Sequence, residues 1–169
     1  TMQAPLDIGE KPFASIKTVA RRNNCTPFMV VMTVLSIAIH GWSSEEDIRI
    51  GTLVANRAQG KTGNVIGPFL NTVILRIEVS SKMSVRELLS QVRTVTLAAH
   101  VNENLPFEHL VRVLEQEQKA QRDSLCPILM SYQMSHCERL ERSGITFASV
   151  GTQQIEAVDR ASPTAFDLI

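Results

Sequence analysis

Residues 72–79 read Thr-Val-Ile-Leu-Arg-Ile-Glu-Val, and the two faces of this segment differ in a regular way. The odd-numbered positions are all apolar, whereas the even-numbered positions include Arg76 and Glu78. An alternation with a period of two predicts a β-strand with one buried face. Residues 48–55 are apolar on both faces, which predicts a strand at the centre of a sheet. Residues 57–67, between the two strands, are rich in Gly, Asn and Gln and predict a loop.

Two helices are predicted before these strands. Residues 12–22 carry apolar side chains at the three-and-four spacing of one helix face. In the next segment Thr26 is a predicted N-cap, Pro27 suits the first turn, and Gly41 suits a left-handed exit. Almost every position between them is apolar, so this second helix is predicted to be enclosed on most faces.

Two more helices and several strands are predicted after residue 79. Ser84 and Glu87 form a capping box for a long helix, and a shorter helix begins near Pro106 and ends in the polar tract 115–123. Strand-like runs follow at residues 128–134, 145–150, 154–158 and 165–169. This order predicts a layered sandwich of the α/β or α+β class, and the 169 residues fit a single domain, 1–169.

The charge and cysteine content of the chain argue against some classes of partner and site. Lys plus Arg and Asp plus Glu both total 17, and a net charge of zero argues against nucleic acid as the main partner. The most apolar run, 27–39, is shorter than the roughly 20 residues of a membrane span. No secretory segment is recognised at residues 1–10. No metal site is predicted, because the three cysteines lie at spacings that match no metal template: Cys25, Cys126 and Cys137. These cysteines are interpreted as reduced thiols, and a cytoplasmic location is therefore expected.

Short motifs add a more specific signal. Residues 66–72, Ile-Gly-Pro-Phe-Leu-Asn-Thr, resemble the Ile-Gly-x-Phe-Val-Asn-Thr motif of condensation domains from nonribosomal peptide synthetases. Residues 102–108, Asn-Glu-Asn-Leu-Pro-Phe-Glu, resemble the His/Asn-Gln-Asp-x-Pro-Phe-Glu motif of that family. Residues 122–128 are a weaker match to its Arg-Asp-x-Ser-x-x-Pro-Leu motif. Residues 26–29 and 50–57 are also similar to the family, so five motifs occur in family order. The departures, which bear on substrate preference, are Pro68 for an aromatic residue, Glu103 for Gln, and a missing Arg before Pro127.

The resemblance implies the C-terminal lobe of a two-lobed fold like that of chloramphenicol acetyltransferase. A tunnel between the lobes admits two phosphopantetheine arms, and the acceptor amine attacks the donor thioester to form an amide. The implied partners are the N-terminal lobe and the donor and acceptor peptidyl carrier proteins. The arm is delivered by the carriers, so no cofactor bound directly by this lobe is expected.

The resemblance also implies that the catalytic residues lie elsewhere. The family's His-His-x-x-x-Asp-Gly motif belongs to the other lobe. The four histidines here are not adjacent to one another, and none precedes an Asp-Gly pair: His40, His100, His109 and His136. No catalytic residue is therefore assigned to this chain, and the chain alone is expected to be inactive. Removal of the covering lobe is also expected to make it self-associate through an exposed apolar face.

Two residues are candidates for the tunnel wall. Asn71 either caps the turn that precedes its strand or faces the tunnel and positions the thioester or pantetheine amide. Arg57 either pairs structurally or steadies the facing lobe. The remaining motif positions are assigned structural roles: Gly67, Phe69, Thr72, Pro106, Phe107, Glu108, Asp123 and Pro127.

Other functions remain open at this stage. One is a non-catalytic module that docks carrier proteins within a synthetase. Others are an ester-forming or an epimerising domain of the same fold.

Overall fold

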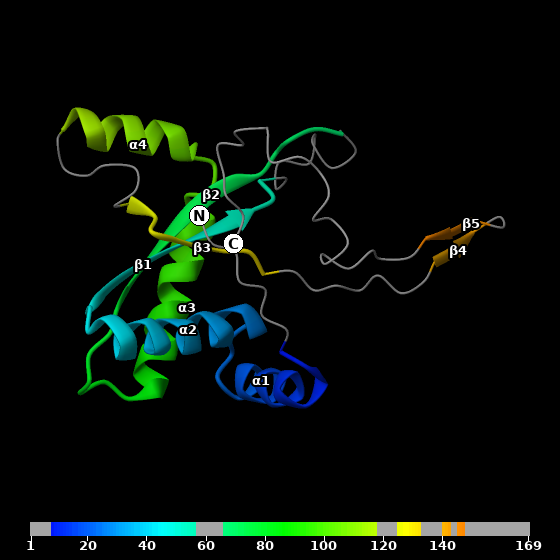
Figure 1. Cartoon of the computed structure of the whole chain (residues 1–169), viewed down its shortest axis with the longest axis horizontal. Helices are drawn as coiled ribbons and strands as arrows, with labels where there is room; N and C mark the ends of the chain where they lie inside the picture. Colours follow the sequence, from blue (N-terminus) through cyan, green and yellow to red (C-terminus); the bar gives the residue numbers. More distant parts are fainter. Residues whose placement is uncertain (1–7, 57–65, 118–124, 133–139, 143–144, 148–169) are drawn as a thin grey trace.

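The computed structural model describes residues 8–56, 66–117, 125–132, 140–142 and 145–147. Helices and strands alternate in blocks along the described chain (Figure 1). In order they are α1 (Glu10–Arg22), α2 (Pro27–Ser43), β1 (Asp47–Val54), β2 (Asn71–Glu78), α3 (Val85–Val101), α4 (Phe107–Gln116), β3 (Ile128–Met130), β4 (Leu140–Arg142) and β5 (Ile145–Phe147). This mixture of helices and a small sheet confirms the predicted layered class.

β1 is the central strand of a three-stranded sheet with the order β2-β1-β3. β1 and β2 are antiparallel, with Asp47 opposite Glu78 and Val54 opposite Asn71, whereas β1 and β3 are parallel. β1 has a neighbouring strand on each edge, which agrees with its mostly apolar composition; the exceptions are Asp47, Arg49 and Thr52. The central position predicted for residues 48–55 is confirmed.

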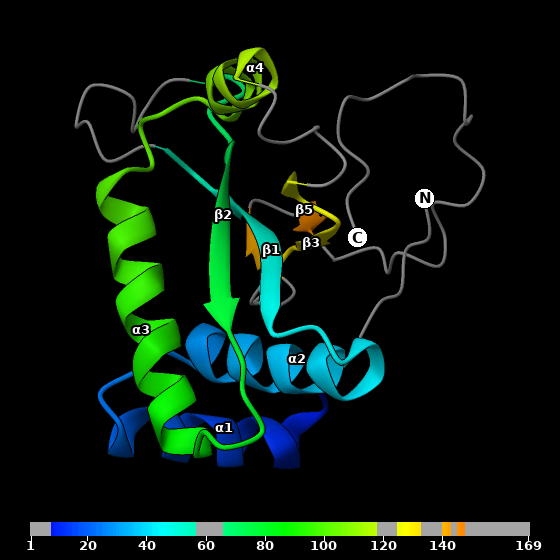
Figure 2. The same ribbon diagram turned by 90° about the vertical axis from the view of Figure 1, so that its left-hand side faces the viewer.

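The main core lies between the sheet and the helices α2 and α3. Figure 2 shows α3 running beside β2, α2 and α1 stacked at one end of the sheet, and α4 at the other end. On β2, Leu75 and Ile77 are almost completely buried, while Arg76 and Glu78 are exposed, as the alternation predicts. The other side chains that are less than 2% exposed are Met32, Ser36, Ile50 and Val92.

Side-chain caps fix where α2 and α3 begin. The Thr26 hydroxyl accepts a hydrogen bond from the Met29 N–H at 3.3 Å. The Ser84 hydroxyl accepts from the Glu87 N–H at 3.3 Å, and the Glu87 carboxylate accepts from the Ser84 N–H at 2.8 Å. The Ser84 hydroxyl also donates to this carboxylate at 2.7 Å, and this bond together with that from the Ser84 N–H holds the pKa of Glu87 below its usual value. Both predicted caps are confirmed.

Two predictions about α2 are wrong. The helix does not leave through Gly41; it continues to Ser43, and Ser44 takes the left-handed conformation with φ 60°. The helix is also not enclosed on most faces, because Val34 is 59% exposed and Trp42 is 93% exposed. Only the side of α2 that meets the sheet, α1 and α3 is covered by the described residues.

Some strand predictions differ from the structure or lie outside it. β3 is Ile128–Met130 within the predicted run 128–134, of which 131 and 132 are not in a strand and 133–134 lie outside the described residues; β5 is Ile145–Phe147 within the predicted run 145–150, of which 148–150 lie outside them. β4 was not predicted; it pairs with β5 in an antiparallel ladder. The runs 154–158 and 165–169 lie outside the described residues.

The length and apolar content of the described helices bear on whether one of them could cross a membrane. No single helix there is long and apolar enough to cross a membrane. α1 and α2 together reach the required length and composition, but the two helices meet at a bend of 105°.

Candidate functional site

The side-chain amide of Asn71 joins the start of β2 to the segment between α3 and α4. Its Nδ2 group donates to the carbonyl oxygens of Glu103 at 2.8 Å and Leu105 at 2.7 Å. Its Oδ1 atom accepts from the backbone N–H of Phe107 at 3.1 Å. Both amide donors and one of the two acceptor positions are thus occupied. This geometry supports the capping alternative for Asn71, with the loop before α4 as the capped backbone in place of the turn at 67–69.

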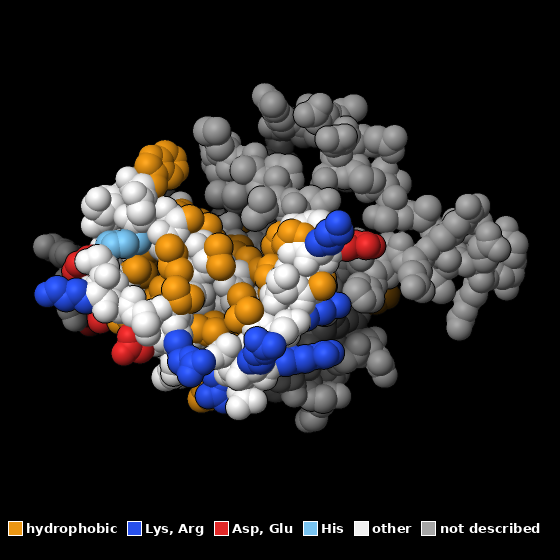
Figure 3. All heavy atoms as spheres, turned by 90° about the horizontal axis from the view of Figure 1, so that it is seen from below, with side chains coloured by type: hydrophobic (Ala, Val, Ile, Leu, Met, Phe, Trp, Pro, Cys, Tyr) orange, Lys and Arg blue, Asp and Glu red, His pale blue; other side chains and the backbone are white. Residues whose placement is uncertain are grey.

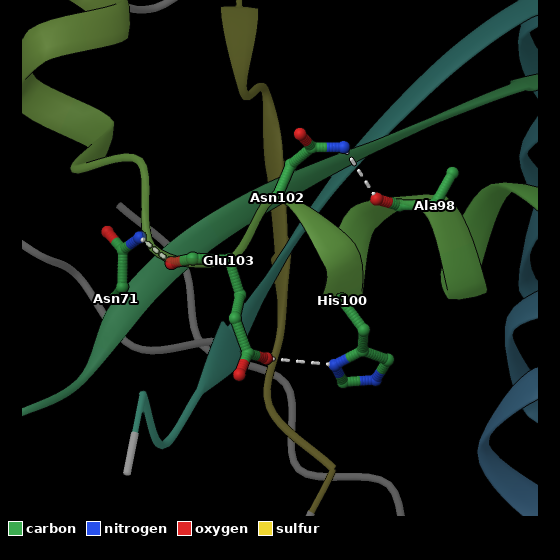
Figure 4. A network of polar contacts seen from close by, with 5 residues as sticks. All are labelled: Asn71, Ala98, His100, Asn102 and Glu103. Carbon is green, nitrogen blue, oxygen red and sulfur yellow. Dashed lines mark hydrogen bonds and ion pairs between the residues drawn. The ribbon is translucent and has the colours of Figure 1, made fainter. Parts of the chain in front are cut away.

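Further contacts hold the same loop (Figure 4). The Asn102 side chain donates to the carbonyl oxygen of Ala98 at 2.9 Å, one turn back on α3. The Nδ1 atom of His100 lies 3.0 Å from Oε2 of Glu103, whose side chain is only 15% exposed. The residue that departs from the family motif, Glu103, is therefore bonded through both its carbonyl group and its carboxylate.

A small cavity lies next to this loop, between α3 and the strands β1 and β2. Its volume is about 150 Å³, and its walls are mainly apolar, with Leu53 and Val73 from the sheet and Ala99 from α3. His100 and Tyr132 are also among its lining residues. The Tyr132 hydroxyl is buried and has no hydrogen-bond partner within the described residues, and burial raises the pKa of this group. A buried hydroxyl without a partner is costly, so the Tyr132 hydroxyl is an energetically unfavourable feature of this region.

The motif residues at the start of β2 make contacts that are typical of a structural role. The ring of Phe69 lies against Gly67, where an added Cβ would be 3.2 Å from the ring. Thr72 is 5% exposed and faces the interior of the sheet. These positions agree with the structural roles predicted for them. Arg57, the second candidate for the tunnel wall, lies outside the described residues.

The second motif forms the beginning of α4, as predicted. Pro106 is the N-cap residue, Glu108 lies in the first turn, and Phe107 is 6% exposed. Phe107 belongs to a small second core with Val111 and Leu125. Of the third motif, Pro127 is exposed just before β3, and Asp123 lies outside the described residues.

The described histidines lie near the ends of α2 and α3 and on the surface of α4. The Nδ1 atom of His40 lies 2.7 Å from the Glu45 carbonyl oxygen at the end of α2, and His109 is exposed on α4. His100 is near the end of α3 and bonded to Glu103. His136 lies outside the described residues. Within those residues no group of three His, Cys, Asp or Glu side chains is placed to hold a metal ion.

Sequence reasoning missed Tyr132. It lies two residues after β3, inside a run that was predicted to be a strand. Nothing in the local sequence marks its hydroxyl as buried. The T-shaped contact with Phe28, at 5.9 Å between ring centroids, joins residues that are far apart in the chain.

Comparison with known proteins gives a family. Residues 3–168 match the Condensation domain family. The chain belongs to that family. The condensation-domain resemblance of the short motifs is thereby confirmed. The matched range covers nearly every residue and includes all five motifs.

Related proteins are large synthetases. The chain is 42% identical over 97 residues to phosphinothricin tripeptide synthetase PhsC of Streptomyces viridochromogenes, covering 57% of this chain and 9% of that protein. It is 34% identical over 146 residues to a dimodular nonribosomal peptide synthase of Bacillus subtilis, covering 83% of this chain and 6% of that protein. This condensation-family chain therefore spans less than a tenth of either relative.

Solved structures show the same fold. A four-domain nonribosomal peptide synthetase bound to AMP and glycine matches with a TM-score of 0.66 and 19% identity, over 80% of this chain and 11% of that one. The first condensation domain of the calcium-dependent antibiotic synthetase, in complex with a substrate analogue, matches with a TM-score of 0.63 and 14% identity, over 78% of this chain and 29% of that one. The chloramphenicol acetyltransferase-like architecture expected for the family is confirmed.

Proposed function

We propose that this chain is the C-terminal lobe of a condensation domain that forms amide bonds in a nonribosomal peptide synthetase. The observation that carries the proposal is the family match over residues 3–168. It is supported by the way the motif residues cluster. Asn71 from the first motif binds the backbone of Glu103, Leu105 and Phe107, which belong to the second.

The proposed reaction joins two substrates held on carrier proteins. The acceptor amine attacks the carbonyl carbon of the donor thioester, so that a C–N bond forms and the C–S bond breaks. The pantetheine thiol leaves, and the amine gives up one proton. This lobe contributes a wall of the tunnel and part of the carrier-docking surface, while a lobe with paired histidines supplies the proton transfer. The phosphopantetheine arms arrive with the carriers, and a cytoplasmic location fits this chemistry.

Asn71 and Arg57 remain the proposed tunnel residues. For Asn71 the contribution is indirect: its bonds place the loop 102–106 beside the cavity lined by Tyr132. Loop placement of this kind positions a bound thioester without a direct contact from the Asn71 amide.

The purified chain alone is expected to form no amide between loaded donor and acceptor carriers. Orientation of both substrates across two lobes supplies much of the rate in such a site, and none of the four histidines belongs to a paired motif. Amide product is measured by mass spectrometry, with carriers alone as the blank. When a lobe that contains His-His-x-x-x-Asp-Gly is fused upstream, product is expected to appear. Turnover by the chain alone at the rate of an intact domain would contradict the proposal.

The same fusion separates the alternative of a non-catalytic docking module. A docking module would bind loaded carriers but leave the fused protein without turnover. Ester-forming chemistry is distinguished by a hydroxyl acceptor in place of the amine. Both tests use the same fused protein, so a folding defect would affect the two measurements equally.

The isolated chain is also proposed to associate with copies of itself. Val34, Ile37 and Trp42 are 59%, 39% and 93% exposed on one side of α2, and monomers seldom expose large apolar patches. The net charge of zero adds little repulsion between copies. Because Trp42 is the only tryptophan, its emission should shift to shorter wavelength as the concentration rises. Light scattering across the same series gives the mass.

A matched pair of variants tests which surface is responsible. Val34→Ser with Ile37→Ser is expected to restore a monomer, whereas Val85→Ser, at a 63% exposed position on α3, is expected to leave association unchanged. A chain that stays monomeric at all concentrations and binds no dye specific for apolar surfaces would refute self-association.

A further inference from the structure

A second, polar cavity lies where the turn between α1 and α2 meets the first turns of α3. Its volume is about 260 Å³. Its lining residues are polar or small, apart from Leu89: Asn23, Asn24, Cys25, Arg86, Ser90 and Arg93. None of the described residues that line it is acidic.

The α3 side of this cavity is built by helical spacing. Arg86, Ser90 and Arg93 are separated by four and three residues, so their side chains project from one face of the helix. The Nε atom of Arg93 donates to the Asn24 carbonyl oxygen at 2.9 Å, which holds the guanidinium against the α1–α2 turn. The outer nitrogens of that guanidinium are not used by this bond.

The positive charge of this cavity is not neutralised by the residues that the structure describes. The ion pairs found among them join Arg76 to Asp47 and His100 to Glu103, and neither involves Arg86 or Arg93. The neighbouring Glu87 carboxylate is bonded to Ser84 at the helix start. Figure 3, seen from below, shows several Lys and Arg side chains in the lower middle of the view, and others beside Asp and Glu at its left and right ends.

We propose that the cavity between the α1–α2 turn and α3 binds a phosphoryl group, with Arg86 and Arg93 as its ligands. Guanidinium groups bind phosphate through paired N–H donors, which makes arginine better suited to this anion than lysine. A phosphate monoester carries a charge of about −1.5 to −2 at neutral pH, which two guanidinium groups neutralise.

The size of the cavity agrees with a small ligand. Pockets that enclose drug-sized molecules measure roughly 300–1,000 Å³, and this one is about 260 Å³. Ser90 and the side-chain amide of Asn24 line the cavity and offer further donors. The electrostatic influence of Arg93 also reaches Cys25, where it opposes the rise in the pKa of that thiol caused by burial. This site does not depend on amide-bond formation.

The test is a titration of the full 169-residue chain with inorganic phosphate and, separately, with ethyl phosphate, followed by amide NMR at constant ionic strength. Saturable shifts are expected for the amides of Asn24, Cys25 and Ser90. A tenfold preference for inorganic phosphate would identify a site for free phosphate. Similar affinities for the two would identify a site for an esterified phosphoryl group.

Three variants make the assignment specific. Arg86→Gln is expected to weaken binding at least tenfold, and Arg86→Lys to weaken it severalfold, because lysine keeps the charge but lacks the paired donors. Arg112→Gln removes the same charge from the exposed face of α4 and should leave the affinity unchanged. Shifts that do not saturate, or equal weakening by Arg86→Gln and Arg112→Gln, would overturn the site in favour of general attraction to a basic surface.

Discussion

Asn71→Ala is expected to lower the free energy of unfolding by about 2–4 kcal/mol, because each intramolecular hydrogen bond contributes roughly 0.5–1.5 kcal/mol and a buried group left without a partner costs more. Three bonds are lost together: those to the Glu103 and Leu105 carbonyl groups and that from the Phe107 N–H. They join parts of the chain 32 to 36 residues apart, so no local contact replaces them. Urea denaturation at fixed protein concentration measures the change.

The matched control for this prediction is Asn102→Ala. Asn102 forms one exposed bond to the Ala98 carbonyl oxygen within its own helix end, so its loss is expected to cost about 0.5–1 kcal/mol. Asn71→Asp keeps an acceptor for Phe107 but places oxygen atoms against two carbonyl groups, and it should not restore stability. If Asn71→Ala costs no more than Asn102→Ala, the amide does not hold the loop.

The same substitution tests the tunnel proposal in an intact domain. If Asn71 positions the loop beside the substrate, Asn71→Ala should slow amide formation at least tenfold, which corresponds to about 1.4 kcal/mol of barrier. The rate is measured per folded molecule, so that lost stability is not counted as lost catalysis. Unchanged turnover together with lower stability would leave Asn71 a structural cap alone.

Gly51→Ala is expected to destabilise the sheet by about 1–3 kcal/mol, the usual cost of adding a carbon to a well-packed interior. Gly51 lies in the central strand β1, opposite Leu129 of β3 and Ile74 of β2. An added Cβ would collide with the Sγ atom of Cys126 and lie 3.0 Å from a methyl group of Leu129. For a domain of this size the expected fall in Tm is about 2–4 °C per kcal/mol. Thermal unfolding followed by circular dichroism measures it.

Two comparisons assign the cost of Gly51→Ala to this collision. Gly51→Ala combined with Cys126→Ala is expected to recover part of the loss, because the smaller side chain vacates the space of the sulfur. Gly41→Ala is expected to have the opposite sign, a gain of about 0.5–1 kcal/mol, because alanine is the better helix former. An added Cβ at Gly41 would meet nothing within 4 Å. A double variant as unstable as the sum of its single changes would locate the strain elsewhere.

The candidate site was only partly predictable from the sequence. The motif order identified Asn71, Phe107 and Glu108 as positions of interest, and the helix start at Phe107 was predicted correctly. The partners of Asn71 were not, since the turn next to it in the sequence was the expected one. Tyr132 and its cavity were not predicted either, because several elements create that cavity and none of them does so alone.

By itself the sequence determined the features that depend on near neighbours. The alternation in β2 set which side chains are buried from Leu75 to Glu78, and the caps at Thr26 and Ser84 set where two helices begin. These signals act over a few residues, so the local chain contains all the atoms involved. Only the tertiary structure decided that Asn71 bonds to a loop more than 30 residues away, and that α2 continues past Gly41 and keeps an exposed apolar side. Those outcomes depend on which surfaces the packing brings together, since a hydrogen bond or a buried contact forms only where a partner is placed.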